Sequence, residues 1–558
     1  MKFSSKVLSQ TVVQLCYAKD IVHIVISPGS RNAPLTIGFN EHGKFKNFSI
    51  VDERCAAFFA LGMAQQLQKP VVLVCTSGSA LLNYYPAIAE AFYSDIPLVV
   101  LSADRPQNLV DIGDGQTINQ ENVFSNHILY NANCKEGDEH QIFNETEINV
   151  ALNTAIELKG PVHINLPFSE PLYNVVDDVQ VQPQHVPARS TNTASSESFV
   201  KELKPFVEKW NQSKKKMILV GVLSPESVEQ QYINSLANDP SVLVLTETTS
   251  NIHHDHFISA IDQLIAPLKE ADFEALQPDI LLTFGGMIVS KKIKAFLRNH
   301  APKEHWHVDE KKAYDTFFSL KKHFKVCPNQ FLKSFLSEAK STESEYHEAW
   351  KQVKDWRTQK HAQYLKQIPF CDFKVHEHII SSLSNPMDMQ LSNSTAIRYS
   401  QLFTIPEKVH VYCNRGTSGI DGSTSTAIGA AYASARQTVL VTGDLGFLYD
   451  SNALWNDHIP NSFRIIVINN GGGGIFRILP KAKDAKNFEH FFETKHTLTS
   501  MHLCAMFGLE YTTAASEETL QKELKTFYNA SESPKLLEVF TPSQINDQVL
   551  LEYFQFIA

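Results

Sequence analysis

The chain has 558 residues, of which 43% are hydrophobic and 20% are charged. Its length suits about three or four domains, and its 35 Phe and 17 Tyr residues exclude a mainly disordered protein. The net charge of −10 argues against a dominant nucleic-acid or anionic-membrane role, and no apolar run is long enough for a membrane span.

The first twenty residues predict an amphipathic helix and not a signal peptide, because Gln10, Thr11 and Gln14 interrupt the apolar stretch. The eight cysteines are scattered and form no CxxC pair, so we expect neither a zinc knuckle nor a disulfide framework. These features indicate a cytoplasmic, reducing location.

Short apolar runs alternate with longer helical stretches along the whole chain, which predicts parallel sheets with crossover helices and therefore an α/β fold. The predicted strands fall into three groups: Ile21–Ile26, Val71–Cys75, Leu98–Leu101 and Val162–Leu166; Met217–Leu223, Val242–Leu245, Ile280–Phe284 and His305–Val308; and Val409–Cys413, Val439–Thr442, Arg464–Ile468 and Leu536–Phe540.

Two stretches of unusual composition divide the chain. Residues 174–197 are polar and rich in Ser and Thr, which is typical of a linker, and residues 338–362 predict a charged, solvated helix. We therefore predict domains at 1–180, 198–345 and 365–558. The middle domain carries only Gly285-Gly286 and no G-x-G-x-x-G, so we expect it to hold no cofactor of its own.

The third domain carries the most informative motif. One predicted strand ends at Gly443-Asp444, and the next ends at Asn469-Asn470, followed by a run of four glycines. Asp444 and Asn470, 26 residues apart, would both lie at the carboxyl edge of a parallel sheet, where α/β folds bind ligands. Carboxylate, amide and carbonyl oxygens suit Mg²⁺, and glycine amides can approach a diphosphate.

An isolated glycine run is most often only a turn. Here the flanking strands and the spacing favour a metal–diphosphate site, with a helix from Ile475 onward offering its positive end.

The first domain offers a candidate catalytic carboxylate. The apolar run Phe48–Val51 leads through Asp52 to Glu53, which begins a predicted helix of apolar character. Desolvation there would favour a shared proton. By itself, Glu53 could equally be a helix-start carboxylate favoured by the dipole.

The GD…NN motif resembles that of the thiamin diphosphate (ThDP) enzyme superfamily. The resemblance implies three doubly wound parallel-sheet domains: a pyrimidine-binding (Pyr) domain, a central domain and a diphosphate-binding (PP) domain. It also implies a homo-oligomer with active sites between subunits, in which Glu53 contacts the pyrimidine ring nitrogen of the cofactor. It assigns Mg²⁺ or Mn²⁺ to Asp444, Asn470 and the carbonyl of Gly472, and the cofactor also to Ser394, Ile420, Leu445, Gly473, Ile475 and Phe476.

Five further motifs are similar to those of one family within this superfamily. They are ISPGSRNAPLT (26–36), ADRP (103–106), GPVHINLPFSEPLY (160–173), NSTAIR (393–398) and NRGTSGIDG (414–422). The family is MenD, the 2-succinyl-5-enolpyruvyl-6-hydroxy-3-cyclohexene-1-carboxylate (SEPHCHC) synthases of menaquinone biosynthesis. The resemblance implies a transferase of aldehyde or ketone residues. It would decarboxylate 2-oxoglutarate and add the succinyl carbanion equivalent to isochorismate, giving SEPHCHC and CO₂.

The substrates carry several carboxylates, and the matching loops carry arginines, which grip carboxylates well. The resemblance assigns Glu53, Ser394, Arg398 and Arg415 to catalysis, the last two also to binding 2-oxoglutarate and its adduct. It assigns isochorismate binding to Ser30, Arg31, Arg105, Gln116 and Lys291, with Lys292 and Lys294 as competitors of Lys291. The family often has Asn where this chain has Gly115.

Two alternatives stay open. One is another ThDP carboligase, such as an acetolactate-synthase-like enzyme, for which an arginine-poor pocket and pyruvate turnover would be evidence. The other is a non-catalytic, cofactor-binding regulator on the same fold, which predicts loss of Glu53 or of the metal ligands, although both are present.

Overall fold

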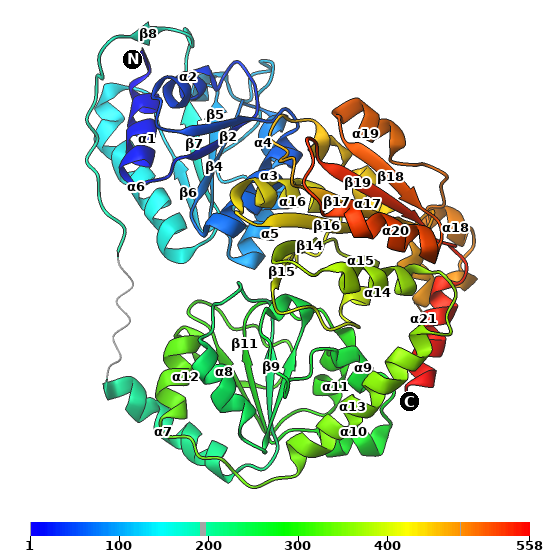
Figure 1. Ribbon diagram of the computed structural model, residues 1–558. Helices are drawn as coiled ribbons and strands as arrows, with labels where there is room; N and C mark the ends of the chain where they lie inside the picture. Colours follow the sequence, from blue (N-terminus) through cyan, green and yellow to red (C-terminus); the bar gives the residue numbers. More distant parts are fainter. Residues whose placement is uncertain (1, 190–196, 480) are drawn as a thin grey trace.

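The computed structural model describes residues 2–189, 197–479 and 481–558, which form three α/β units, each with a parallel sheet between helices (Figure 1). This confirms the predicted fold class. In the described part of the chain, no helix combines the length and the apolar character needed to cross a bilayer. All eight cysteines lie in the described part and are free thiols.

The first unit holds one six-stranded sheet. Its strands are β2 (His23–Ile26), β3 (Lys46–Ser49), β4 (Val71–Cys75), β5 (Leu98–Asp104), β6 (Tyr130–Asn133) and β7 (Val162–Pro167). Its helices are α1 (Val7–Ala18), α2 (Ala33–Glu41), α3 (Glu53–Leu67), α4 (Ser79–Asn83), α5 (Tyr85–Ser94) and α6 (Gln141–Leu158). The strand order is β3-β2-β4-β5-β7-β6. Side chains of α1, α2 and α6 pack on one face of the sheet, and those of α3 and α5 on the other.

The middle unit is smaller. Its strands are β9 (Lys216–Val220), β10 (Val242–Thr246), β11 (Ile280–Phe284), β12 (Glu304–Val308) and β13 (Leu320–Phe324), in the order β10-β9-β11-β12-β13. Its helices are α7 (Glu197–Gln212), α8 (Gln230–Ala237), α9 (Ile261–Ile265), α10 (Glu270–Leu276), α11 (Lys291–Asn299) and α12 (Pro328–Leu336). The predicted strand Met217–Leu223 ends early, because Gly221 turns against the backbone of Gly286 too closely for any side chain.

The third unit repeats the topology of the first. Its strands are β14 (Met387–Leu391), β15 (Val409–Cys413), β16 (Gln437–Gly443), β17 (Arg464–Asn469), β18 (Glu510–Ala514) and β19 (Lys535–Phe540). Its helices are α14 (Asp372–Ser382), α15 (Thr395–Ser400), α16 (Ser423–Ala433), α17 (Asp444–Tyr449), α18 (Phe488–Phe491), α19 (Met501–Phe507), α20 (Glu517–Phe527) and α21 (Asn546–Phe556). The order β15-β14-β16-β17-β19-β18 places the switch point between β14 and β16, as it lies between β2 and β4 in the first unit.

The first and third units share a core. Buried side chains from both sheets join one hydrophobic cluster around α3, α5 and α16, and the two units lie side by side (Figure 1). Helices α3 and α16 approach very closely at two glycines. A Cβ on Gly62 would lie 1.9 Å from the carbonyl oxygen of Thr426, and one on Gly429 would lie 2.0 Å from that of Phe59.

Two connections join the units along the chain. Part of the predicted linker pairs with the first unit, because β8 (Val175–Val176) is antiparallel to β1 (Phe3–Ser4), whereas residues 190–196 lie outside the described ranges. The predicted charged helix is α13 (Tyr346–Leu365), which is less solvated than expected because Tyr346 and Trp350 pack into the middle unit. The domain boundaries stay a prediction.

The middle unit also contacts the edge of the third sheet. Asn251 donates its side-chain amide to the carbonyl of Val411 at 2.9 Å and accepts from the Val411 amide at 2.8 Å. Val411 lies in β15, which is the edge strand of that sheet. One side chain thus takes the place of a neighbouring strand at this residue.

Candidate functional site

Asp444 begins α17 directly after β16, beside the switch point of the third sheet. Its side chain is buried. Its Oδ2 accepts from the amides of Gly471 and Gly472 at 2.9 and 3.0 Å, so the glycine run closes over the carboxylate. Burial raises the pKa of Asp444, an effect opposed by these amides and by His496, whose Nε2 lies 3.3 Å from Oδ2.

Asn470 follows β17 and is also buried. Its Nδ2 donates to Oδ2 of Asp372 at 2.8 Å, while no donor among the described residues contacts its Oδ1. Asp372 is itself held by Thr541, whose hydroxyl donates at 2.6 Å. Burial raises the pKa of Asp372 to about 6. Because the Asp372 carboxylate takes the amide nitrogen of Asn470, the amide oxygen is available as a ligand atom.

The glycine run adopts a backbone that side chains would obstruct. Gly471 and Gly472 have φ values of 77° and 152°, and a Cβ on Gly472 would lie 2.6 Å from the carbonyl oxygen of Glu493. The predicted helix from Ile475 onward is wrong: a single 3₁₀ turn, Gly474–Ile478, follows, and we assign no helix-end binding to it. The other residues predicted to contact the cofactor are all partly buried: Ile420, Leu445, Gly473, Ile475 and Phe476.

Glu53 is the first residue of α3, with Asp52 as the N-cap that accepts from the amide of Cys55 at 3.1 Å. The apolar run Phe48–Val51 is a strand only in part, because β3 ends at Ser49, and Ile50 and Val51 belong to the connection to α3. Glu53 is partly buried, and Asn83 donates to its Oε2 at 3.2 Å. No hydrogen bond within the described chain joins Glu53 to the Asp444 loop.

The four residues of the first unit that are predicted to bind isochorismate lie at the carboxyl edge of its sheet. Ser30 and Gln116 are exposed, and Arg105 is partly buried and donates to the Gly115 carbonyl at 3.0 Å. Ser77, after β4, donates to the carbonyl of Gln116 at 3.0 Å. These bonds bring the loop at Gly115-Gln116 onto the ends of β4 and β5.

Arg31 differs from the other arginines because its side chain is almost wholly enclosed, with 3% of the residue exposed. Its Nη1 donates to the Phe168 carbonyl at 2.8 Å, and its Nη2 lies 3.2 Å from the Glu170 carboxylate. Protein groups therefore contact both terminal nitrogens of this guanidinium, whereas its buried Nε has no partner in the described chain.

The third unit brings three more predicted residues together. Ser394 is the N-cap of α15, with a φ of 71°, and its carbonyl accepts from Nη1 of Arg398 at 2.8 Å. Arg415 donates from Nη1 to Oδ1 of Asn393 at 2.6 Å, and its buried Nε has no partner in the described chain. Burial and the nearby charge of Arg415 lower the pKa of Arg398. The two guanidiniums form a cationic cluster after β14 and β15.

The three candidate lysines belong to the first turn of α11 in the middle unit. Lys291 and Lys292 are exposed, and Lys292 lies over the ring of Phe554 at 5.0 Å. Lys294 is half-buried, and burial lowers its pKa while Glu247 raises it. The beginning of α11 therefore faces the third unit.

Three family models match the chain in succession. The thiamine pyrophosphate enzyme N-terminal TPP-binding domain matches residues 6–127, the middle domain of thiamine pyrophosphate enzymes matches 185–391, and the C-terminal TPP-binding domain matches 393–539. These matches confirm the ThDP enzyme assignment.

Curated relatives match the whole length. The 2-succinyl-5-enolpyruvyl-6-hydroxy-3-cyclohexene-1-carboxylate synthase of Flavobacterium psychrophilum is 56% identical over 98% of each chain. The synthase of Christiangramia forsetii is 55% identical over all of both chains, and that of Porphyromonas gingivalis is 36% identical over 100% of this chain and 98% of its own. The chain belongs to the SEPHCHC synthase family.

The residues of the Asp444 loop fit ThDP, and their oxygen atoms would suit a divalent cation at its diphosphate. The amide oxygen of Asn470 accepts from no donor in the described chain, the Asp444 carboxylate is buried against the glycine amides, and the positive-φ glycines allow a loop backbone that a side chain at Gly472 would block. The described residues contain no cluster of three or more His, Cys, Asp or Glu side chains suited to a metal, so a cation here would need the Asn470 amide, backbone carbonyl and ligand oxygens besides the Asp444 carboxylate.

Sequence reasoning missed the residues that hold these family motifs in place. Besides Asp372, they include Glu90 of α5, which is buried and accepts from the amides of Gly416 and Thr417 at 2.7 and 2.6 Å. Glu90 thus fixes the loop that carries Arg415. His496 beside Asp444 was also missed. None has a local pattern, because each acts through a contact distant in sequence.

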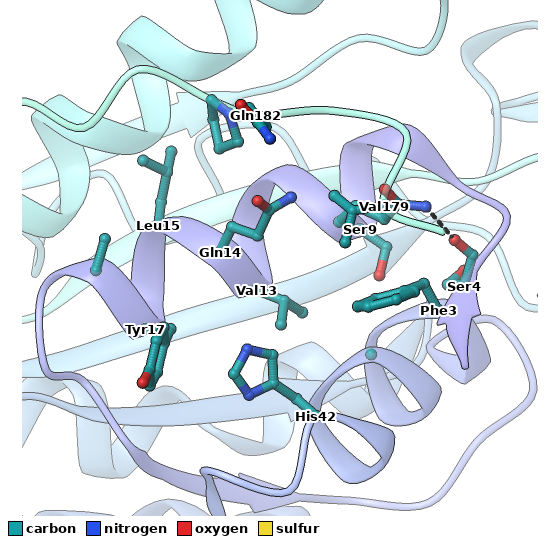
Figure 2. Close-up of a pocket in the computed structure, with 14 residues that line it drawn as sticks. Phe3, Ser4, Ser9, Val13, Gln14, Leu15, Tyr17, His42, Val179 and Gln182 are labelled. Carbon is teal, nitrogen blue, oxygen red and sulfur yellow. Dashed lines mark hydrogen bonds between the residues drawn. The ribbon is translucent and has the colours of Figure 1, made fainter. Parts of the chain in front are cut away.

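One groove of the first unit is lined by none of the predicted site residues. The cavity of about 380 Å³ drawn in Figure 2 lies between α1, α2 and the segment 179–183. Phe3, Val13, Tyr17, His42 and Val179 line it, with neutral polar side chains between them. It contains none of the predicted site residues, so we do not assign the ThDP-dependent reaction to this cavity.

Proposed function

We propose that the protein catalyses the ThDP-dependent decarboxylation of 2-oxoglutarate and the addition of the succinyl unit to isochorismate, giving SEPHCHC and CO₂. The full-length likeness to SEPHCHC synthases supports this function. The observation that carries it is the placement of Asp444 and Asn470 at the carboxyl ends of the neighbouring strands β16 and β17, with the glycine run bound to the Asp444 carboxylate.

Asp444, Asn470 and the carbonyl of Gly472 would hold Mg²⁺ or Mn²⁺ and, through it, the diphosphate. The ThDP held there would supply the nucleophile and the electron sink that decarboxylation of a 2-oxo acid needs. Glu53 would share a proton with the pyrimidine ring nitrogen. Ile420, Leu445, Gly473, Ile475 and Phe476 would pack around the cofactor.

Arg398 and Arg415 would bind the carboxylates of 2-oxoglutarate, with Ser394 beside them. Burial and the nearby positive charge of Arg415 both lower the pKa of Arg398, so the two like charges repel each other in this cluster. A dianionic substrate relieves that repulsion, because it brings one carboxylate to each cation. This electrostatic match favours 2-oxoglutarate over pyruvate, which carries a single carboxylate.

Ser30, Arg105, Gln116 and Lys291 would contact isochorismate, and Arg31 would do so with the guanidinium edge left by Phe168 and Glu170. Arg105 has a buried Nε without a partner in the described chain. An incoming carboxylate would satisfy this donor.

We infer a homo-oligomer in which Glu53 serves the Asp444 loop of a second copy. Exposed apolar side chains surround Glu53: Val51 and Leu82 are each 45% exposed, and Tyr449 is 58% exposed. Such a surface around a catalytic carboxylate suits burial by another subunit.

The test is 2-oxoglutarate consumption by the purified protein with ThDP and Mg²⁺, with and without isochorismate, and with pyruvate as the control donor. Consumption that depends on isochorismate, with SEPHCHC detected by mass spectrometry, is the expected result. Turnover of pyruvate instead would assign the protein to another ThDP carboligase and overturn the proposal.

A further inference from the structure

A buried carboxylate of the middle unit grips the beginning of α11. Glu247 follows β10 and is 3% exposed. Its Oε2 accepts from the amide of Val289 at 2.7 Å, and its Oε1 accepts from the amide of Ser290 at 2.7 Å. Both carboxylate oxygens are thus used on two consecutive amides immediately before Lys291.

A second carboxylate completes the grip. Ser290 is the N-cap of α11 and accepts from the amide of Ile293 at 3.1 Å. Its hydroxyl in turn donates to Asp262 of α9. Ser290 is therefore held through its backbone by Glu247 and through its side chain by Asp262. We call Glu247, Ser290 and Asp262 the α11 clamp.

The α11 clamp lies against the third unit. The side chain of Val289 is buried in the hydrophobic cluster that contains Ile397 and Val411 of the third unit. Gln263, next to Asp262, donates to the carbonyl of Leu402 at 2.6 Å, just beyond α15. The clamp thus holds the first turn of α11 against the elements that carry Arg398 and Arg415.

Charge also links the clamp to that cationic cluster. Burial raises the pKa of Glu247 to about 7, while the two amides and the charge of Arg415 act in the opposite direction. Burial raises the pKa of Asp262 as well, and Lys292 and Arg398 oppose this. Two carboxylates of the middle unit therefore face the cations of the candidate site.

We propose that Glu247 is a positioning residue for acceptor binding, which places Lys291 and Lys292 at the edge of the active site through the α11 clamp. This inference rests on the proposed function. It gives the middle unit a role in the reaction: it delivers the acceptor-side cations, although it needs no cofactor of its own. Glu247 itself touches no substrate.

The chain offers a matched control at the other end of the same strand. Asp239 precedes β10 and is also buried, where it accepts from Lys216 Nζ at 3.2 Å and from the amide of Ser241 at 3.0 Å. Asp239→Asn removes a buried charge from the same domain without touching α11. A merely structural role of Glu247 would make the two variants behave alike.

The test compares Glu247→Gln with Asp239→Asn in the full-length holoenzyme. The glutamine amide must point its NH₂ at one backbone N–H, so one clamp bond is lost. We expect the KM for isochorismate to rise about tenfold or more, as for loss of a charged hydrogen bond, with kcat changed less than about threefold. Asp239→Asn should leave this KM unchanged. An unchanged KM in Glu247→Gln, or an equal rise in both variants, would overturn the proposal.

Hydrogen exchange separates this inference from the proposed function. In Glu247→Gln, the peptide spanning residues 287–294 should lose protection by about tenfold or more, and the Asp239→Asn peptide should not. If wild-type protein fails to use isochorismate, the proposed function falls and exchange alone decides the clamp. Unchanged protection of this peptide would then overturn it.

Discussion

The side-chain amide of Asn470 donates to Asp372 at 2.8 Å, and this single bond holds the amide nitrogen on Asp372 and leaves the amide oxygen available to a ligand. Asp372 begins α14, almost a hundred residues earlier in the chain, yet it is buried directly behind Asn470. Outer residues of this kind orient the ligands of metal sites. Asp372 would therefore support the proposed cation site although no motif includes it.

Replacing Asp372 by Asn removes this orientation, because an amide can face Asn470 either way round. We expect Mg²⁺ affinity in the presence of ThDP to fall about 10- to 100-fold. Isothermal titration calorimetry measures this directly. Asp388→Asn is the control, since Asp388 is buried near the beginning of β14, where the amino ends of the strands of the same sheet lie. Wild-type affinity in Asp372→Asn would remove Asp372 from this role.

Co-expression of two inactive variants tests the shared active site. Glu53→Gln should bind ThDP but lose about a hundredfold or more of its turnover, and Asp444→Ala should lose cofactor binding. If each site takes Glu53 and Asp444 from different subunits, randomly mixed dimers regain about one quarter of wild-type activity, because half of them hold one intact site. Sites built within one subunit would stay inactive in every mixture.

Arg398→Ala should raise the KM for 2-oxoglutarate about tenfold or more, as expected for loss of a charge-assisted contact to a carboxylate. The KM for isochorismate should change little. Steady-state kinetics with each substrate varied in turn separate the two effects. Arg436→Ala serves as the control, since Arg436 pairs with Asp388 away from the glycine run. An equal rise in both KM values would contradict donor-specific binding.

Asp450 makes the contact between the first and third units sensitive to pH. It is fully buried, it accepts from the amide and hydroxyl of Ser425 at 2.7 and 2.8 Å, and it lies 3.6 Å from Arg54 of α3. Burial raises its pKa from 3.8 to about 7. The folded state therefore binds this proton more tightly than the unfolded state. The resulting stability is complete below pH 3.8 and is lost as the pH rises towards about 7.

Asp450→Asn keeps an acceptor for Ser425 and removes the titration. Between about pH 5 and 7, the free energy of unfolding of wild type, relative to this variant, should fall by up to about 1.4 kcal/mol per pH unit. Urea unfolding followed by circular dichroism measures the difference. A constant difference across this range would show that Asp450 does not titrate there.

Uninterrupted apolar runs made most strands predictable from the sequence, because strands buried on both faces consist almost wholly of such residues. Four strands of the parallel sheets that prediction missed carry polar side chains instead: β6 is YNAN, β13 is LKKHF, β14 is MDMQL and β18 is EYTTA. In β14, Asp388 is buried with Arg436, a partner that only the folded chain supplies. The repeat of topology between the first and third units was likewise invisible in residue identities.

The candidate site likewise contains residues that the sequence made predictable and residues that it did not. Asp444, Asn470 and the glycines were predictable because a strand end, a ligand atom and a flexible backbone lie within one motif. The supporting carboxylates were not, since Glu90 and Gly416 are 326 residues apart and meet only across two units. An isolated Glu in an apolar helix gives no local signal of such a contact.

The two hydrogen bonds between Asn251 and Val411 have a consequence for solubility. An edge strand with free amides and carbonyls invites pairing with the edge of another molecule. Here a single amide side chain occupies that edge at its centre, so the docked middle unit shields β15 from aggregation. Displacement of the middle unit would expose β15 to pairing with strands of other molecules. The position of this domain therefore affects how long the protein stays free of aggregates in the cell.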